Sequence, residues 1–510
     1  MSTTKPDVNV RAGHQGTVES VSVADSGVDR LKPNAVGLMG VIFVAVTGAA
    51  PISAMLFNVP FSVGFGTGLY TPAAFLFATV ILTIFSVGYV AMARKIRAAG
   101  GFYSFISHGL GRELGMAAGI TGALSYSLFE VSLLGGFAYF ANTNFHSWFG
   151  WNIPWPLFAF GAAALICVFC YFDVELSVRV LGVALIGEIV ILTIFDLLVF
   201  GQGGKEGIPV EALNPLKLTS PGVGLAAGVG LFLAFWSWVG FEAVPNYAEE
   251  SRNPRRNVPL ATMISVIGLG IGYVITSLAF VSSFPKSTLV KDAQNPDGPF
   301  FVAMRGFGSH WLATIMQVLI LTGSFACALA FHNVAMRYFY ALGRERILPR
   351  ALGRTHPVHK SPYIASFVQT GVAVGIVLVW AISAGFGKPF DVAYVRIYTM
   401  MAVQGVVWIL AIQAVCALAI IVYHRRHKHP DSAWVVVVCP MIAILGQVFA
   451  IYLLFKNIDV LAGTIGYVDA IAPIAVIAVV GAVAYAFALK RTNRAKYDMI
   501  GRMIDEGVTP

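Results

Sequence analysis

Long runs of apolar residues, which few charges interrupt, dominate this sequence. A run of about 20 such residues is long enough to cross the hydrocarbon core of a bilayer as a helix. Hydrophobic residues make up 57% of the 510 positions and charged residues only 12%, whereas an ordinary soluble domain carries about 25% charged residues. These features predict an all-α, polytopic integral membrane protein.

The apolar runs predict about twelve transmembrane helices. The polar segment 1–33 is expected to be a disordered cytoplasmic tail, because Met1 to Arg30 contains no apolar stretch that resembles a signal peptide. Residues 34–490 are expected to form the transmembrane domain, and residues 491–510 a second cytoplasmic tail. The predicted spans are 36–57, 71–93, 115–143, 155–173, 178–200, 222–248, 258–283, 310–342, 362–384, 395–423, 434–455 and 468–490.

The net charge of +9 comes from basic residues that lie mainly in short segments between the apolar runs. The positive-inside rule explains this placement better than a nucleic-acid partner does. It favours an even number of spans in the plasma membrane, with both termini in the cytoplasm and lipid around the chain.

The sequence shows no signature of a metal site, a cofactor or an enzyme. Cys167 and Cys170 form a C-x-x-C pair inside an apolar run, without a second ligand pair, so packing explains them best. Motifs of the H-E-x-x-H or G-x-S-x-G type are missing from the chain.

Two spans carry glycine and polar residues at their centres: Val46-Thr-Gly-Ala-Ala-Pro-Ile-Ser53 in the first and Phe235-Trp-Ser-Trp-Val-Gly-Phe-Glu242 in the sixth. Interrupted helices at matching positions of two halves indicate the binding site of a transporter. Backbone groups freed at membrane depth must face a wet cavity or a polar ligand. The N-terminus of the second half-helix suits a carboxylate, and the opposite carbonyls suit an ammonium group.

A simpler alternative exists for the same residues. Gly48 and Gly240 would then serve only to bring two helices close together, and Pro51 would only kink its span.

The sixth span and the segment after it resemble the amino acid–polyamine–organocation superfamily of permeases. The resemblance rests on Phe235-Trp-Ser-Trp-Val-Gly-Phe-Glu-Ala243 and on Glu249-Glu-Ser-Arg-Asn-Pro-Arg-Arg-Asn-Val-Pro-Leu-Ala261. The stretch Arg337-Tyr-Phe-Tyr-Ala-Leu-Gly-Arg-Glu-Arg-Ile-Leu-Pro349, with Thr355-His-Pro357 and Ser361-Pro362, is similar to the end of the family's eighth span and the loop after it.

The resemblance implies two inverted five-span repeats, spans 1–5 and 6–10, with helices 1 and 6 broken and two peripheral spans. It implies a secondary active transporter that moves amino acids or related amines by alternating access, either coupled to protons or working as an exchanger. By matching motif, the substrate carboxylate would be bound at Thr47, Gly48, Ala49 and Ala50. The facing half would be lined by Trp236, Ser237, Trp238 and Gly240, with Trp236 closing over the substrate.

Buried acidic residues are costly in a membrane, so each one calls for a partner or a function. Glu188 in span 5 is predicted to face span 1 and Ser324 of span 8 and to carry the coupling proton. The alternative is that Glu188 anchors an arginine or a backbone group. Glu130 in span 3 is either a counter-ion for a cationic substrate or a side chain bonded to a neighbouring span. Glu242 either organises helix packing or belongs to an inner gate.

Other functions remain as alternatives at this point. Use of Glu130 as a counter-ion would favour a polyamine, a cationic amino acid or another small amine as the substrate. A channel-like protein or a substrate sensor could also use a broken-helix site, although no filter motif is recognisable and the tails are too short to form an output domain.

Overall fold

The computed structural model describes residues 31, 34–96, 100–172, 174–218, 227–295, 298–427, 431–458, 460 and 467–501. Of the predicted N-terminal tail, all but Leu31 lies outside the described residues. Within these ranges the regular structure is helical, apart from an isolated bridge between Val36 and Ser251.

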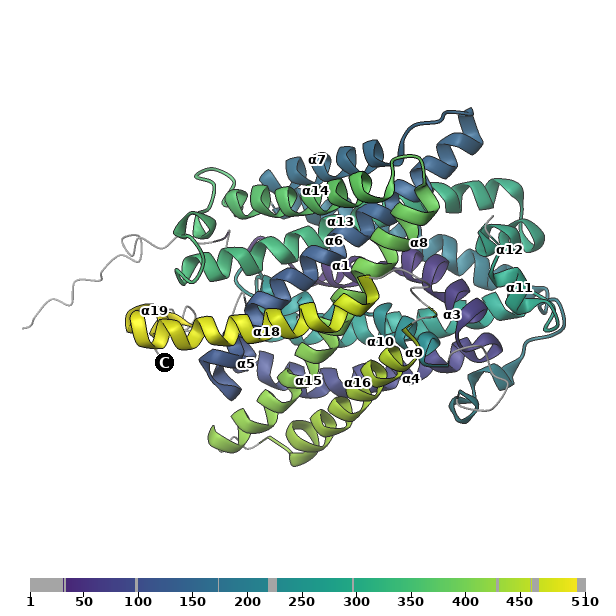
Figure 1. Cartoon of the computed structure of the whole chain (residues 1–510). Coiled ribbons are helices and arrows are strands. Elements are labelled where there is room, and N and C mark those ends of the chain that lie inside the picture. The colour runs from purple at the N-terminus through teal and green to yellow at the C-terminus, as the bar shows by residue number, and fades with distance from the viewer. Residues whose placement is uncertain are drawn as a thin grey trace, which may run out of the picture.

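The helices run along one long axis of the molecule (Figure 1); η denotes a 3-10 or π-helical segment. They are α1 (Leu38–Ala49), α2 (Pro51–Ser53), η2 (Ala54–Asn58), α3 (Val59–Phe65), η3 (Gly68–Tyr70), α4 (Thr71–Ala93), α5 (Phe102–Leu110), α6 (Arg112–Phe149), α7 (Trp155–Tyr171), α8 (Val174–Gly201), η4 (Val210–Leu213), η5 (Pro215–Lys217), α9 (Ala227–Trp236), η6 (Phe241–Tyr247), α10 (Pro254–Ser282), α11 (Leu289–Ala293), α12 (Pro299–Phe307), α13 (His310–Arg344), η7 (Arg350–Gly353), α14 (Tyr363–Ala384), η8 (Pro389–Met400), α15 (Met401–His427), η9 (Trp434–Val438), α16 (Cys439–Lys456), α18 (Tyr467–Thr492) and α19 (Arg494–Met499).

The described residues contain 11 helices that are long and apolar enough to cross a membrane. A shorter apolar helix, α7, lies between the third and fourth of the long helices, where the fourth span was predicted. The predicted polytopic all-α architecture is therefore confirmed, whereas the inverted five-plus-five repeat stays a prediction.

The first span ends beyond its predicted boundary for a local reason. The first span continues to Phe65, beyond the predicted end at residue 57, through the π-helical segment η2. Pro60 follows directly in the first turn of α3. A proline lacks an N–H and its ring clashes with the carbonyl four residues earlier, so the helix before it cannot keep regular α-helical hydrogen bonds. The same order recurs where η9 precedes Pro440 at the start of α16.

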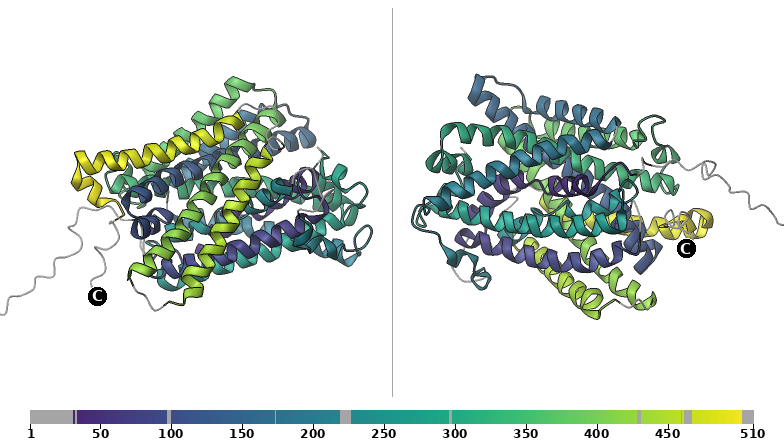
Figure 2. Two further views of the ribbon diagram at one scale, coloured as in Figure 1. Left: turned by 60° about the horizontal axis from the view of Figure 1, so that its bottom comes forward. Right: turned by 180° about the vertical axis from the view of Figure 1, so that it is seen from behind.

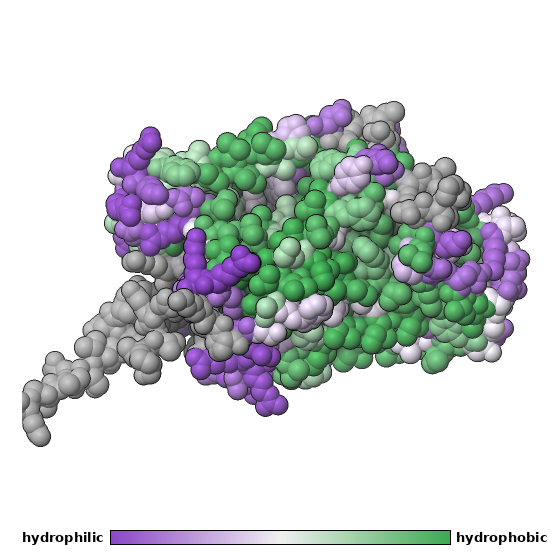
Figure 3. Space-filling model, turned by 90° about the horizontal axis from the view of Figure 1, so that it is seen from below, coloured by the Kyte–Doolittle hydropathy of each residue, from purple (hydrophilic) through white to green (hydrophobic). Residues whose placement is uncertain are grey.

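The surface matches a protein surrounded by lipid. Figure 3 shows hydrophobic residues over the middle of the molecule and hydrophilic residues gathered at its two ends. Large apolar side chains such as Val183, Leu197 and Ile477 are exposed on the helices of this middle zone. Exposed apolar side chains in such number are expected where hydrocarbon replaces water.

The core is built around α6 and α13, which pack along each other and against α14. Helix α1 packs against α8, α10, η6 and α13, so both broken spans lie inside the bundle. The pairs α7 with α14 and α4 with α16 lie side by side nearer the outside (Figures 1 and 2).

The two ends of the bundle are named here by their helices. At the α19 end, Asp498 forms an ion pair with Arg112 at the start of α6 (2.5 Å), and the Tyr497 hydroxyl donates to Glu113 (2.7 Å). At the α12 end, Gln202 after α8 donates to the carbonyl of Phe307 (2.6 Å). Figure 1 shows these helices at opposite ends of the molecule.

A buried ion pair joins the segment after η6 to α13. Arg337 donates to one oxygen of Glu250 through Nη2 (2.7 Å) and Nε (3.1 Å). Its guanidinium also lies 4.0 Å from the ring centre of Tyr247 and donates to Asn333. Both charged side chains are almost fully buried, so removal of one partner would leave the other charge without compensation.

Replacement of Glu250 by alanine is expected to destabilise the protein strongly, by about 3–5 kcal/mol, because the Arg337 charge stays buried. The apparent melting temperature of the purified protein in detergent measures this effect, and we expect a decrease of several degrees. The control is Glu211→Ala, which removes an exposed partner of Lys286 and should leave the melting temperature almost unchanged. Equal melting temperatures for the two variants would contradict the assignment.

Candidate functional site

The first span is broken at Ala50, inside the predicted segment 46–53. Helix α1 ends at Ala49, and Ala50 adopts a left-handed conformation with φ 45° and ψ 72°. Pro51 then starts α2. A continuous helix would need an N–H at Pro51 and would press the proline ring against the carbonyl of Thr47. That carbonyl instead accepts from the Ala50 N–H (3.0 Å).

The sixth span is broken between Trp236 and Phe241. Helix α9 ends at Trp236, and the chain turns through Gly240, whose φ of 122° suits glycine. The Glu242 carboxylate accepts from the freed N–H of Gly240 (3.0 Å) and from the Tyr126 hydroxyl of α6 (2.9 Å). These bonds agree with the packing role considered for Glu242.

The two breaks touch each other. A Cβ atom added to Gly240 would lie 2.5 Å from the carbonyl carbon of Gly48, and one added to Gly48 would lie 3.3 Å from the Cα of Gly240. Side chains are therefore excluded from this crossing. The two interpretations of these glycines, a helix break and a close helix contact, describe the same place in the structure.

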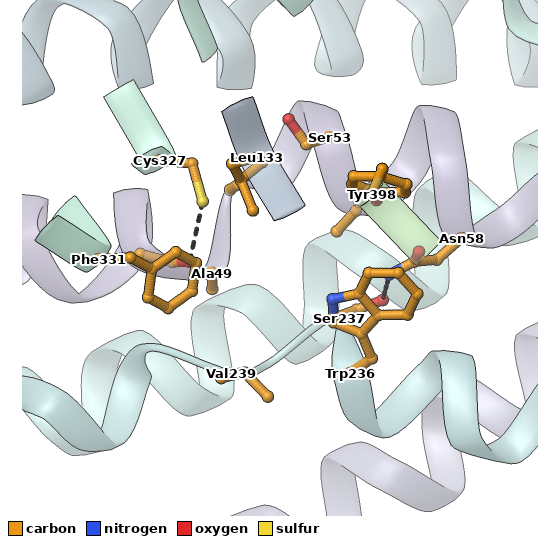
Figure 4. Close-up of a pocket in the computed structure, with 13 residues that line it drawn as sticks. Ala49, Ser53, Asn58, Leu133, Trp236, Ser237, Val239, Cys327, Phe331 and Tyr398 are labelled. Carbon is orange, nitrogen blue, oxygen red and sulfur yellow. Dashed lines mark hydrogen bonds between the residues drawn. The ribbon is translucent and has the colours of Figure 1, made fainter. Parts of the chain in front are cut away.

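A cavity opens between the two breaks and contains about 290 Å³ of unoccupied space (Figure 4). The lining carries no ionisable side chain except a thiol and a phenol. It consists of Gly48, Ala49, Ala50, Ser53, Ala54, Asn58, Leu133, Trp236, Ser237, Val239, Cys327, Phe331 and Tyr398.

The structure separates the predicted binding residues into two groups. Gly48, Ala49, Ala50, Trp236 and Ser237 line the cavity.

Thr47, Trp238 and Gly240 are not among the lining residues. Trp238 instead packs its ring against Tyr273 (4.9 Å between centroids) and donates from its indole to the carbonyl of Val266 (3.3 Å). It lies two residues beyond Trp236 on a tight turn, so the two indoles point to different sides.

Polar atoms at the cavity are only partly engaged. Asn58 donates from Nδ2 to the Ser237 hydroxyl (2.9 Å), which links the two broken spans. Figure 4 shows this bond beside the indole of Trp236. The hydroxyl of Ser53 is buried and has no hydrogen-bond partner, so it is available to a ligand.

The carbonyls at the end of α1 have partners on other helices. The Tyr273 hydroxyl of α10 donates to the carbonyl of Ala49 (2.9 Å), and the thiol of Cys327 on α13 donates to that of Gly48 (3.4 Å). Each carbonyl keeps a second lone pair that could accept from a ligand.

Aromatic rings form one wall of the cavity. The Trp236 ring lies 5.3 Å from that of Tyr398, which stacks on Phe57 at 4.2 Å. On another side, Phe331 stacks on Phe129 at 4.9 Å. This wall suits an apolar group of a ligand.

Sequence reasoning missed the walls supplied by spans 3, 8 and 10. Asn58 and Ser53 could have been noticed as polar residues in an apolar run. Leu133, Phe331 and Tyr398 carry no local signal that distinguishes them from ordinary core residues.

Glu188 lies behind the first break, against the start of α2. Its Oε2 accepts from the N–H of Ile52 (3.2 Å), and its Oε1 has no partner. A Cβ on Gly323 would lie 2.9 Å from Oε1, so the carboxyl contacts both span 1 and span 8. The Ser324 hydroxyl bonds to the carbonyl of Ile320 in its own helix, whereas the Glu188 oxygens are bound to the Ile52 N–H or have no partner.

Glu130 belongs to a buried hydrogen-bond network away from the cavity lining. Its Oε1 bonds to Nδ1 of His332 (2.9 Å), and its Oε2 accepts from Gln369 (2.6 Å). The other nitrogen of His332 bonds to Ser366 (2.9 Å). The network joins α6, α13 and α14, which is the arrangement that the packing alternative for Glu130 requires.

Across the ranges that the structure describes, no three His, Cys, Asp or Glu side chains are grouped as potential metal ligands.

A family model described as amino acid permease matches residues 36–483. The branched-chain amino acid permease BcaP of Bacillus subtilis is 25% identical over 59% of this chain and 67% of its own length. The methylthioribose transporter of the same organism is 22% identical over 77% of this chain and 81% of its own length. The low-affinity putrescine importer PlaP of Escherichia coli is 22% identical over 62% of this chain and 66% of its own length.

Replacement of Gly240 by alanine is expected to destabilise the fold, because the new Cβ meets the backbone of Gly48 and the positive φ is strained. We expect a melting temperature several degrees below that of the wild type. Gly268→Ala in α10 is the matched control, since nothing lies within 4 Å of its Cβ position. A Gly240→Ala protein as stable as this control would argue against the close contact.

Proposed function

The chain belongs to the amino acid permease family, and we propose that it is a secondary active transporter for small neutral amino acids that uses the cavity between the two helix breaks. The membrane-spanning fold and the family both support the transporter role. Alternating access and the nature of the substrate are the parts proposed here.

We infer a neutral substrate because the residues that line the cavity include no charged side chain. A cationic side chain or a polyamine would lose its hydration there without meeting a carboxylate, which is unfavourable. Glu130 could have supplied that charge, but His332 and Gln369 already occupy its two oxygens. One relative is a branched-chain amino acid permease, which agrees with a neutral substrate.

The two ends of an amino acid match the two polarities at the breaks. The N-terminus of the helix that starts at Pro51 has a partial positive charge, and the unpartnered Ser53 hydroxyl lies in its first turn. These groups would bind the carboxylate. The C-terminal carbonyls of α1, including that of Gly48, would accept from the ammonium group, and the substrate side chain would lie against Trp236 and Tyr398.

Cationic amino acids and polyamines form the second candidate class, because one relative is a putrescine importer. A channel or a sensor would also contain a ligand cavity. Saturable uptake that a competing substrate inhibits distinguishes a transporter from both.

Charge placement supports a cytoplasmic α19 end. Arg94 follows α4, Arg112 starts α6, Arg252 precedes α10 and Arg344 ends α13. These ends lie together with α19, and the positive-inside rule assigns such an end to the cytoplasm. The plasma membrane is the proposed location, with the α12 end outside.

Uptake into proteoliposomes tests the substrate class. We expect leucine, valine and alanine to compete with each other, whereas arginine, lysine and putrescine in the same excess should not compete. Trp236→Ala should weaken apparent affinity by about tenfold, since it removes an aromatic wall. Trp434→Ala, which removes an exposed indole, serves as the control. Stronger competition by arginine or putrescine than by the neutral amino acids would overturn the proposed class.

Glu188 is the proposed coupling group. Its carboxylate is bound to the N–H of Ile52, in the first turn after the break, and so contacts the half-helix that would hold the substrate carboxylate. Protonation would weaken this bond and change the charge at the helix N-terminus. Proton binding and substrate binding would thereby be linked.

Glu188→Gln should abolish accumulation driven by a pH gradient, because an amide cannot take up the proton. Exchange of labelled for unlabelled substrate at equal pH should continue, since it needs no net proton movement. Glu211→Gln, at an exposed site, is the control. Accumulation by the Glu188→Gln protein at the wild-type level under a pH gradient would exclude the coupling role.

A further inference from the structure

A second carboxyl, Asp196, lies on α8 two turns beyond Glu188. Its side chain is 9% exposed. Its Oδ2 accepts from the hydroxyl of Thr276 on α10 (2.8 Å), and its Oδ1 is buried without a hydrogen-bond partner. An acidic residue placed so deeply in a membrane helix calls for a function.

Asp196 and Glu188 share an arrangement that Glu130, Glu242 and Glu250 lack. In each, one oxygen accepts from a neutral donor and the other has no partner. By contrast, both oxygens of Glu130 and both of Glu242 are engaged, and Glu250 is paired with an arginine. A free oxygen without a nearby cation gives a carboxyl a place to hold a proton.

The neighbouring helices bring no opposing charge to either carboxyl. Tyr273 of α10 and Cys327 of α13, which donate to the carbonyls at the end of α1, are the nearby titratable side chains of these two helices. Asp196 accepts from the neutral Thr276 hydroxyl. Helices α1, α2, α7 and α12, which also pack against α8, contribute no ion pair to either group in the part of the chain described.

The two carboxyls lie at different depths on one buried face of α8. Eight residues of helix correspond to a rise of about 12 Å. Glu188 lies beside the first break, whereas Asp196 lies six residues before Gln202, which bonds to α12. Asp196 is therefore the carboxyl nearer the α12 end.

Helix α10 carries polar groups along the same interval. Thr276 bonds to Asp196, and one turn earlier the Tyr273 hydroxyl reaches the carbonyl of Ala49 at the break. The hydroxyls of Thr276 and Tyr273 thus lie between the α12 end and the depth of Glu188. The interface of α8 and α10 therefore carries polar groups between Asp196 and the first break.

We propose that Asp196 is the proton acceptor on the α12 side that passes protons to Glu188, an inference that rests on the proposed proton-coupled function. The Asp196 carboxylate takes a proton from a hydronium ion at the α12 end, which is left as water. The proton then passes through intervening water molecules to the Glu188 carboxylate, and Asp196 returns to its ionised form. One O–H bond breaks for each O–H bond that forms, and one positive charge moves inward.

The test separates proton delivery from substrate handling in proteoliposomes that contain the full chain. One assay measures accumulation driven by a pH gradient, and the other measures exchange of labelled substrate at equal pH. Asp196→Asn should lower accumulation by about tenfold, within the usual range for coupling between two sites, and leave exchange nearly unchanged. Asp196→Glu should restore accumulation. The control is Asp391→Asn, which changes an exposed acid at the start of η8.

A second variant keeps the test decisive if Asp196→Asn does not fold. Thr276→Val removes the hydroxyl and leaves the carboxyl, so it should shift the outside pH for half-maximal accumulation while exchange stays unchanged. Wild-type accumulation in Asp196→Asn, or an unshifted pH profile in Thr276→Val, would overturn the proposal. Equal loss of exchange and accumulation in a folded Asp196→Asn protein would also overturn it.

The wild-type protein tests the underlying function separately. Failure of the wild type to accumulate any amino acid under a pH gradient would refute the proposed function itself. Accumulation by the wild type that does not depend on Asp196 would refute only the relay.

Discussion

A backbone amide or carbonyl inside a membrane must find a hydrogen-bond partner, because lipid offers none. Both helix breaks depend on how this requirement is met. Tyr273 and Cys327 donate to the carbonyls at the end of α1. Glu242 accepts from the N–H freed at Gly240, and Glu188 accepts from that of Ile52. Side chains from three other spans therefore help to stabilise the breaks in the first and sixth spans.

The global fold was readable from the sequence because its causes are local. Hydrophobic run length predicts a span without knowledge of its neighbours, and within the described residues each of the twelve predicted positions contains helix. The break at Ala50 follows from Pro51, and the break before Phe241 from Gly240. The end of the first span was missed because Pro60 is tolerated behind a π-helical segment, a compensation that composition does not reveal.

The site was only half predictable because its walls come from distant parts of the chain. The two breaks carry their own signals, so Gly48 and Trp236 were found. Phe331 and Tyr398 were not, since only packing shows that they face a cavity and not the core. Likewise, a lone acid such as Asp196 stands out in an apolar run, but its partner Thr276 lies 80 residues further along the chain.

The crossing of Gly48 and Gly240 has a mechanical consequence. The two backbones touch there without side chains between them. No interlocking side chains therefore oppose a change in the crossing angle of the two helices at that point. In the proposed transport cycle the helices would tilt about this point, whereas sliding past it would bring the bulkier residues on either side into the crossing. A tilt that widens the space between them toward one membrane face narrows it toward the other. The crossing would therefore open the two faces in turn and not together.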